Sequence, residues 1–362
     1  MRTKDLFKQQ YNLYMTKSKK PNNRLASFIS NNRELLGWIA AGSLVVIFHN
    51  FSLHLSVWIA SGEAGKWLSQ AALSLQDFLT LTLSVIVEAV PFLILGTIIS
   101  ALIRCFLPPE KLVKILPKNA LFRRLVLSIA GLALPVCECG NVPVARRLLA
   151  RGLKPADVVS FLFAAPILNP ITIIATITAF SFEPRMVWWQ VIFALVIVQI
   201  TAFIVSFFKE DSIINPEFKN YCRSHKHSSN LPELFSSSRN EFWQLFTMLV
   251  IGASIAAATQ VFVPRFIINA VGSDTILSVA AMIGLSFIVS ICSSIDAFFA
   301  LAYARSFTTG SILSFLLAGP MVDIKLIMLM KTTFRWRFIV VIVLIIFALS
   351  FAAGIGVNLY AR

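Results

Sequence analysis

Long apolar runs separated by short polar stretches dominate the sequence. Several of them reach the roughly 20 residues that a helix needs to cross a bilayer. Because a bilayer offers the backbone no hydrogen-bond partners, such runs favour helices, and the pattern predicts an all-α polytopic membrane protein. The apolar segments cover about 35–55, 78–103, 121–137, 141–152, 156–180, 187–208, 242–263, 275–292, 294–305, 310–330 and 338–358.

The amino-acid composition supports the class of membrane proteins and indicates which partners to expect. Of the 362 residues, 57% are hydrophobic and 14% are charged, against about 45–50% and about 25% in soluble domains. A water-soluble enzyme is therefore excluded. The net charge of +15 fits the basic cytoplasmic loops of membrane proteins, so we expect contact with a lipid bilayer and no nucleic acid.

The loop charges predict the orientation. Residues 1–33 contain eight basic residues and one acidic residue, which is typical of a cytoplasmic tail. We therefore expect a multi-pass protein of the plasma (bacterial inner) membrane with a cytoplasmic N-terminus, and we interpret Arg146 and Arg147 as topology determinants. The basic, inside stretches are 104–124, 146–157 and 331–337, and the outside stretches with one basic residue each are 56–77, 181–186 and 264–274.

Two of the inside stretches flank a segment that must fold back on itself. Because 104–124 and 146–157 both belong on the cytoplasmic side, the chain between them enters the membrane and returns through the same face. This predicts a re-entrant helical hairpin with its tip at residues 135–143, where two prolines and Gly140 interrupt the helix. Interrupted backbone at membrane depth is tolerated only inside protein or beside a water-filled cavity.

The two halves of the chain resemble each other. Residues 95–108 align with 251–264 at a shift of 156, and 164–166 align with 318–320 at a shift of 154. Pro, Gly and Cys match as well as aliphatic residues, which indicates an internal repeat. The aligned pairs that carry sulfur or polar groups are Cys137 with Cys292, Asn141 with Asp296, and Asn169 with Asp323.

Each repeat is predicted to contain about three spanning helices plus a re-entrant helical hairpin. Three is an odd number, so the second repeat enters the membrane from the opposite side and the two structural repeats are inverted. Inverted repeats with discontinuous helices are typical of secondary transporters, whose substrate sites lie near the midplane. The predicted organisation is a basic cytoplasmic tail at 1–34, an extra transmembrane helix and external loop at 35–77, the first repeat at 78–208, a cytoplasmic linker at 209–241 and the second repeat at 242–358.

The motifs of both halves carry a family resemblance. The stretch Cys137–Arg146, the stretch Gly152–Pro155 and the later Ala164–Pro170 resemble the predicted-permease family of bacteria that includes the methylarsenite efflux permease ArsP and the YraQ-like proteins. Residues 292–323 of the second half show a weaker similarity to the same motifs, and the resemblance covers roughly residues 75–358. It implies a permease of the plasma membrane, with arsenicals as the cargo of one branch.

Three cysteines are candidates for substrate binding. Cys137 and Cys139 lie two residues apart in a stretch predicted to be non-helical, so both thiols can face one cavity with Cys292. Soft thiolates select soft ions such as Cu(I) or Zn²⁺, and by the same reasoning trivalent arsenic. No structural metal site or cofactor is expected, because only three thiols converge and no histidine falls in the hairpins. The alternative that these cysteines pack as small hydrophobic residues stays open.

Ionisable and amide groups complete the predicted site. Charged side chains inside a membrane are costly and are functional candidates by default. Asp323 and Lys325 can instead pair near an interface, and helix N-termini at the breaks would favour an anion. The predicted substrate-binding residues are Cys137, Glu138, Cys139, Asn141, Asn169, Cys292, Asp296 and Asp323.

These features predict a membrane permease, a secondary transporter and not an enzyme, that moves a small thiophilic or oxyanionic solute. The family resemblance implies that the solute is a trivalent organoarsenical and that the permease exports it. Two alternatives stay open: a membrane subunit of a multi-component permease that docks a partner at 209–241, and a membrane thiol redox protein, although the Cys-x-x-Cys spacing of that class is lacking. A homodimer is equally open.

Overall fold

The computed structural model describes residues 65–106, 116–133, 137–219, 231–262 and 275–360. Within these ranges the secondary structure is helical, apart from an isolated bridge between Ile214 and Phe334. The chain forms two compact units, Met1–Gln76 and Asp77–Arg362. The predicted cytoplasmic tail (1–34) and the apolar segment of the predicted extra helix (35–55) lie outside the described residues. The all-helical class is confirmed.

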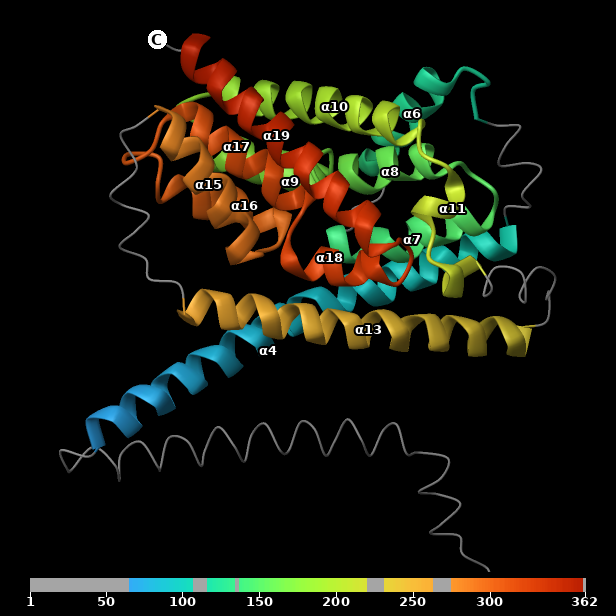
Figure 1. The fold of residues 1–362 in the computed structure, drawn as a ribbon, viewed down its shortest axis with the longest axis horizontal. Helices are drawn as coiled ribbons and strands as arrows, with labels where there is room; N and C mark the ends of the chain where they lie inside the picture. The colour runs from blue at the N-terminus through green and yellow to red at the C-terminus, as the bar shows by residue number, and fades with distance from the viewer. Residues whose placement is uncertain (1–64, 107–115, 134–136, 220–230, 263–274, 361–362) are drawn as a thin grey trace, which may run out of the picture. The chain divides into compact units, whose positions relative to one another are not determined.

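The order of helices in the first half recurs in the second (Figure 1). Among the described residues of each half, a long helix is followed by four short helical segments and then by another long helix. The first half contains α4 (Gly65–Phe106), α6 (Ala120–Ile129) with the 3₁₀ turn η1 (Ala130–Ala133), α7 (Glu138–Ala150), α8 (Pro155–Ala164), α9 (Pro170–Ala179) and α10 (Arg185–Val205). After α11 (Glu210–Ile213), the second half contains α13 (Leu231–Phe262), α15 (Thr275–Val289), α16 (Ser293–Leu301), α17 (Thr309–Met321), α18 (Ile324–Lys331) and α19 (Trp336–Tyr360).

Helix contacts follow the same repeated order. Helix α8 packs against α6, α7 and α10, and α17 packs in the same way against α15, α16 and α19. The short helices also contact the opposite half, since α9 packs against α16 and α18 packs against α7. In Figure 1 these short helices lie between α10 and α13. The two halves therefore meet partly through these short helices, and partly through the packing of α10 on α17 and α19.

Two apolar segments of the sequence are each divided by a helix break in the structure. The segment 156–180 divides into α8 and α9, because Pro170 cannot continue a helix and Asn169 caps α9 by accepting the Ile171 N–H. The segment 310–330 divides into α17 and α18 at Val322 and Asp323, whose backbone is extended. The hydropathy pattern does not reveal these breaks, because the residues around them are apolar.

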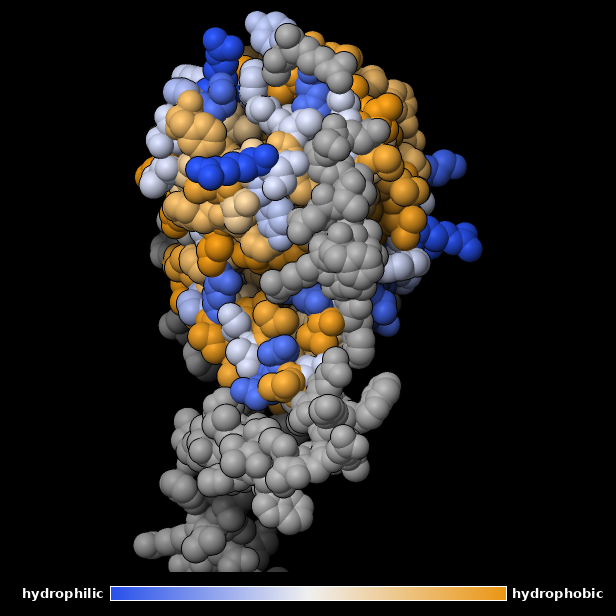
Figure 2. Space-filling view, turned by 90° about the vertical axis from the view of Figure 1, so that its left-hand side faces the viewer, coloured by the Kyte–Doolittle hydropathy of each residue, from blue (hydrophilic) through white to orange (hydrophobic). Residues whose placement is uncertain are grey.

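The described surface is apolar over large areas. Among the described residues, five helical segments are long and apolar enough to cross a membrane: Leu73–Ile103, Arg185–Val205, Ser238–Val261, Thr309–Lys331 and Trp336–Tyr360. The fourth is 94% buried inside the protein, whereas the others are 28–39% buried. Figure 2 shows apolar side chains over much of the face that it displays. The chain is thus a multi-pass membrane protein with one span enclosed by the rest.

Aligned glycines allow the long helices to approach the short ones. A Cβ on Gly96 of α4 would lie 2.2 Å from the Gly140 carbonyl oxygen of α7, and a Cβ on Gly252 of α13 would lie 2.8 Å from the Cα of Lys325 in α18. Both glycines occupy equivalent positions in the sequence repeat. Only a residue without a side chain permits backbone contact of this kind.

A buried ion network joins α7 to α13. Arg146 Nε lies 3.5 Å from Glu241 Oε1, and Arg147 Nη2 lies 2.9 Å from Glu241 Oε2, with each of the three side chains at most 7% exposed. Arg146 also donates to Thr332 Oγ1 and Gln244 Oε1. These arginines, interpreted from the sequence as topology determinants, therefore also hold the two halves together. Helix α13, which includes Glu241, begins at Leu231 inside the stretch predicted as the linker.

We expect Glu241→Ala to lower the free energy of unfolding by about 3–5 kcal/mol, because it leaves two buried guanidinium groups without their carboxylate. The measurement is the thermal unfolding midpoint of protein purified in detergent. Glu210→Ala, at an exposed position of α11, is the matched control and should leave the midpoint unchanged. Equal midpoints for the two variants would contradict the role given to Glu241.

Candidate functional site

Four helix N-termini meet between the two halves. Thr172 in the first turn of α9 lies 3.5 Å from Ser293 in α16, measured between the hydroxyl oxygens. The starts of α16 and α7 meet through their cysteines, and the starts of α7 and α18 meet through an ion pair. The N-cap residues of these helices are Cys137 for α7, Asn169 for α9, Cys292 for α16 and Asp323 for α18. Two of the three aligned pairs from the sequence, Cys137 with Cys292 and Asn169 with Asp323, thus cap the helices that build the site.

Cysteine thiols from both halves lie together. The Sγ atoms of Cys137 and Cys292 and a carboxylate oxygen of Glu138 lie within 4.8 Å of one another, and all three residues are buried. Cys139, two residues after Cys137 in the first turn of α7, is buried as well. The three cysteines are free thiols. This cluster, Cys137, Glu138, Cys139 and Cys292, is called the thiol cluster below.

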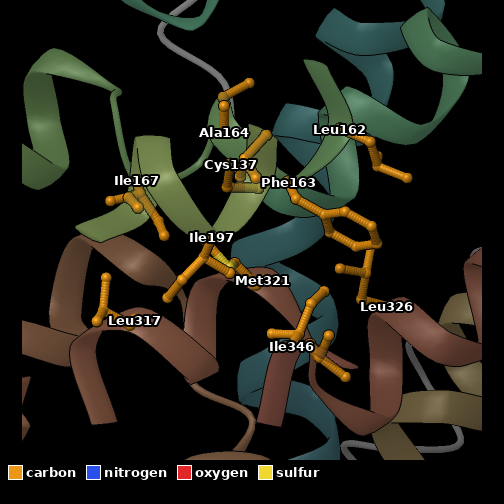
Figure 3. Close-up of a cluster of buried hydrophobic side chains, with 14 of the residues drawn as sticks. Cys137, Leu162, Phe163, Ala164, Ile167, Ile197, Leu317, Met321, Leu326 and Ile346 are labelled. Carbon is orange, nitrogen blue, oxygen red and sulfur yellow. The ribbon is translucent and has the colours of Figure 1, made fainter. Parts of the chain in front are cut away.

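Apolar side chains surround one side of the thiol cluster. In the close-up, Cys137 lies among buried residues of α8, α10 and α17, including Phe163, Ile197 and Met321 (Figure 3). Thiols in such surroundings are shielded from water. A soft, weakly hydrated ligand would lose little hydration free energy on entering this environment, whereas a strongly hydrated ion would lose much more.

Lys325 connects the carboxylates of the site. Its Nζ lies 2.9 Å from Glu138 Oε1 in the first half and 3.2 Å from Asp323 Oδ2 in the second half. It also donates hydrogen bonds to the carbonyl oxygens of Ser290 and Ile291, at 2.9 and 3.0 Å, in the break between α15 and α16. The ammonium is thus bound by oxygen atoms from three of the converging segments.

Several polar atoms at the site have no hydrogen-bond partner among the described residues. They are Glu138 Oε2, both polar atoms of the Asn141 carboxamide and Asp296 Oδ2. Asn141 is completely buried, one helical turn after Cys137, and Asp296 holds the equivalent place after Cys292. Buried polar groups are nearly always paired, and exceptions in a native structure mark places where water, an ion or a substrate binds. The thiol cluster is therefore flanked by unused hydrogen-bonding groups.

The remaining predicted site residues have local roles as well. The Asn169 carboxamide oxygen accepts the Ile171 N–H and so starts α9. Asp323 Oδ1 accepts the Leu326 N–H at 2.6 Å and so starts α18. Asp296 lies against α17, where a Cβ on Gly319 would come within 3.1 Å of Asp296 Oδ2. All eight predicted residues are buried, but the contacts link Cys137, Glu138, Cys139, Cys292 and Asp323 more directly than the other three.

The sequence marked Lys325 as a charged candidate within an apolar segment, but Lys325 was not among the predicted substrate-binding residues. The alternative that Lys325 and Asp323 pair with each other is correct, although the pair is buried at a helix break. Residues i and i+2 do not share a helix face, but Asp323 is a cap with extended backbone and the rule does not apply to it. An uncompensated lysine in an apolar segment was the available signal, whereas its partner Glu138 lies 187 positions away and could not be read from the sequence.

Comparison with known proteins shows the family of the chain. Residues 74–359 match a family described as predicted permease. The chain belongs to this permease family. It is 35% identical over 280 residues to the UPF0718 protein YcgR of Bacillus subtilis, which covers 76% of this chain and 95% of that protein. It is also 35% identical over 271 residues to a Streptococcus mutans protein named "Putative two-component membrane permease complex subunit", covering 74% and 90% of the two chains.

No solved structure matches this member of the permease family. The family match, residues 74–359, spans nearly the same part of the chain as the two halves described above. The comparisons therefore support a membrane permease.

The two functions of the Asp323 carboxylate can be separated by substitution. Asp323→Asn keeps an oxygen that can accept the Leu326 N–H, whereas Asp323→Ala loses it, and both remove the charge that faces Lys325. Since loss of an N-cap costs about 0.5–2 kcal/mol, we expect the alanine variant to be less stable than the asparagine variant by about 1 kcal/mol. Thermal unfolding in detergent measures the difference.

Asn119→Ala is the control for capping alone. Asn119 caps α6 at an exposed position outside the site, so its loss should lower stability modestly and leave transport unchanged. Equal stability of the two Asp323 variants would show that the N-cap hydrogen bond of Asp323 does not contribute to the stability of α18.

Proposed function

We propose that this permease is a secondary transporter that binds a small thiophilic solute at the thiol cluster and moves it across the plasma membrane by alternating access. The observation that carries this proposal is the composition of the cluster: thiols from the first half (Cys137) and the second half (Cys292) lie within 4.8 Å of each other and of the Glu138 carboxylate. A ligand held by both would be released when the halves separate.

The two halves are proposed to be inverted repeats with re-entrant hairpins at α6–α7 and α15–α16. The recurring order of helices and the matched packing of α8 and α17 support this. So do the crosswise contacts of α9 with α16 and of α18 with α7. Transporters built from inverted repeats bind their substrates where discontinuous helices meet near the midplane. The cytoplasmic N-terminus rests on the loop charges and belongs to the same proposal.

The charges of the site favour a thiophilic solute over an oxyanion. Helix N-termini attract anions, but three of the four at this site already have a carboxylate at their start: Glu138 at α7, Asp296 at α16 and Asp323 at α18. Lys325 forms ion pairs with two of these carboxylates, Glu138 and Asp323. An oxyanion would therefore meet more negative than positive charge.

Trivalent organoarsenicals fit the proposed class. A monosubstituted arsenite carries two hydroxyl groups on arsenic, and each can be replaced by a thiol. For each replacement one arsenic–oxygen bond and one sulfur–hydrogen bond break, one arsenic–sulfur bond forms, and one water leaves. Cys137 with Cys139 or Cys292 would supply the two sulfurs, with no change of oxidation state.

A second candidate is a permease subunit that works with a partner chain. The name of the Streptococcus mutans relative describes a subunit of a two-component complex. In this chain the residues after α10 pack on the second half, since Asn215 donates from its backbone to the Thr333 carbonyl and Arg335 donates from its backbone to the Ile213 carbonyl. A partner bound at 209–241 would thus be coupled to the start of α19. Copurification of a second protein with the tagged chain would favour this candidate.

The substitutions Cys137→Ser and Cys139→Ser together test the thiophilic function. Serine keeps a polar group of similar size but does not form stable bonds to trivalent arsenic. We expect the double variant to lose the resistance to methylarsenite or phenylarsine oxide that the wild type gives an arsenical-sensitive host. Growth inhibition curves are the measurement, with membrane levels compared by immunoblot.

Cys222→Ser is the matched control, because this cysteine lies outside both hairpins of the sequence. It should give wild-type resistance. Full resistance from the double variant at equal membrane level would remove trivalent arsenicals from the proposal. Absence of resistance from the wild type itself would have the same effect while leaving the permease class intact.

A further inference from the structure

The surroundings of Lys325 have the composition of a cation site. Its ammonium has oxygen neighbours at 2.9–3.2 Å that comprise two carboxylates and two backbone carbonyls. The carbonyls belong to Ser290 and Ile291, where the chain is no longer helical, so they have no helical N–H partner of their own. This set, with Glu138 and Asp323, is called the oxygen cage below.

The protein backbone is arranged around the cage. Ser290 has a φ of +46°, an unusual value for a residue with a side chain. Its hydroxyl also accepts the Ile324 N–H, which ties the break between α15 and α16 to the start of α18. On the other side, Gly252 of α13 leaves no room for a Cβ against the Lys325 backbone. The position of the lysine is therefore fixed from two sides.

Unwound backbone carbonyls and acidic groups at discontinuous helices are the ligands that secondary transporters use for coupling cations such as Na⁺. In this chain the equivalent ligands surround an ammonium that is covalently part of α18. Two buried carboxylates close together need a cation between them, because removing one partner of a buried pair leaves an uncompensated charge. Lys325 satisfies that need without an ion from solution.

We propose that the oxygen cage is a monovalent-cation site whose resident cation is the ammonium of Lys325. The cage joins the halves of the protein, since Glu138 belongs to α7 and the other three ligands belong to the second half. A chain without the lysine side chain would bind a small monovalent cation from solution in its place. The wild type, in contrast, needs no dissolved cation at this position.

The test is cation-dependent stability of the full chain with Lys325→Ala, purified in detergent. Thermal midpoints are compared in choline chloride, sodium chloride, potassium chloride and methylammonium chloride at equal ionic strength. Choline is too large for the cage and serves as the inert salt. We expect Lys325→Ala to unfold at a lower temperature than the wild type in choline, and its midpoint to rise by several degrees, in a saturable way, with at least one small cation.

The controls separate the cage from general salt effects. The wild type should have the same midpoint in all four salts. Lys331→Ala, which removes an exposed lysine from the end of the same helix, should behave like the wild type. Lys325→Met fills the space with an uncharged chain and should show no cation response. Glu138→Gln combined with Lys325→Ala removes one carboxylate and should weaken the response.

A Lys325→Ala midpoint that is the same in all four salts would overturn the proposal. If this variant does not accumulate, the readout is the amount of folded protein from the triple variant Glu138→Gln, Asp323→Asn, Lys325→Ala. Its uncharged cage needs no cation, so the proposal requires that the triple variant be recovered in larger amount than Lys325→Ala. Equal, poor recovery of the two would contradict it. These readouts do not depend on which solute the permease carries.

Discussion

The structure depends on interrupted helices that are satisfied inside the protein. A helix that ends within a membrane leaves N–H and C=O groups that lipid cannot bind. Here the breaks are made by four N-cap residues, and the free carbonyls of Ser290 and Ile291 are bound by the Lys325 ammonium. The caps act within their own half, since Asn169 accepts the Ile171 N–H and Asp323 accepts the Leu326 N–H. The halves then meet at the breaks, where Lys325 pairs with Glu138 and where α9 packs on α16, and the site lies at this meeting point.

This constraint explains why polar chemistry is concentrated at one place in an otherwise apolar core. The thiol cluster has apolar neighbours on the side of α8 and α17, and the oxygen cage on the side of α18. Glu138 belongs to both, through its carboxylate. A ligand at the thiols would therefore act on the same group that pairs with Lys325, and the two halves would respond to it together.

The arginine network at the far end of α7 has a different role. Arg146 and Arg147 pair with Glu241 of α13, more than two helical turns from Cys137 along α7. Helix α7 is thus held at its start by the site and at its end by an ion network. Both attachments cross from the first half to the second, which makes α7 the element through which movement of one half would reach the other.

The sequence alone determined the helical class and the identity of the residues with unusual chemistry. Apolar length sets the class because a bilayer excludes unsatisfied backbone, and the aligned positions singled out Cys137, Asn169, Cys292 and Asp323, which are helix caps in the structure. It did not determine where the helices break in 156–180 and 310–330, because the hydropathy of a broken segment equals that of a continuous one. Only the tertiary structure decided that Lys325 pairs with Glu138 and that Arg146 and Arg147 pair with Glu241. Ion pairs between positions far apart in the sequence depend on how the helices pack, and a single sequence does not show which charged residues will form them.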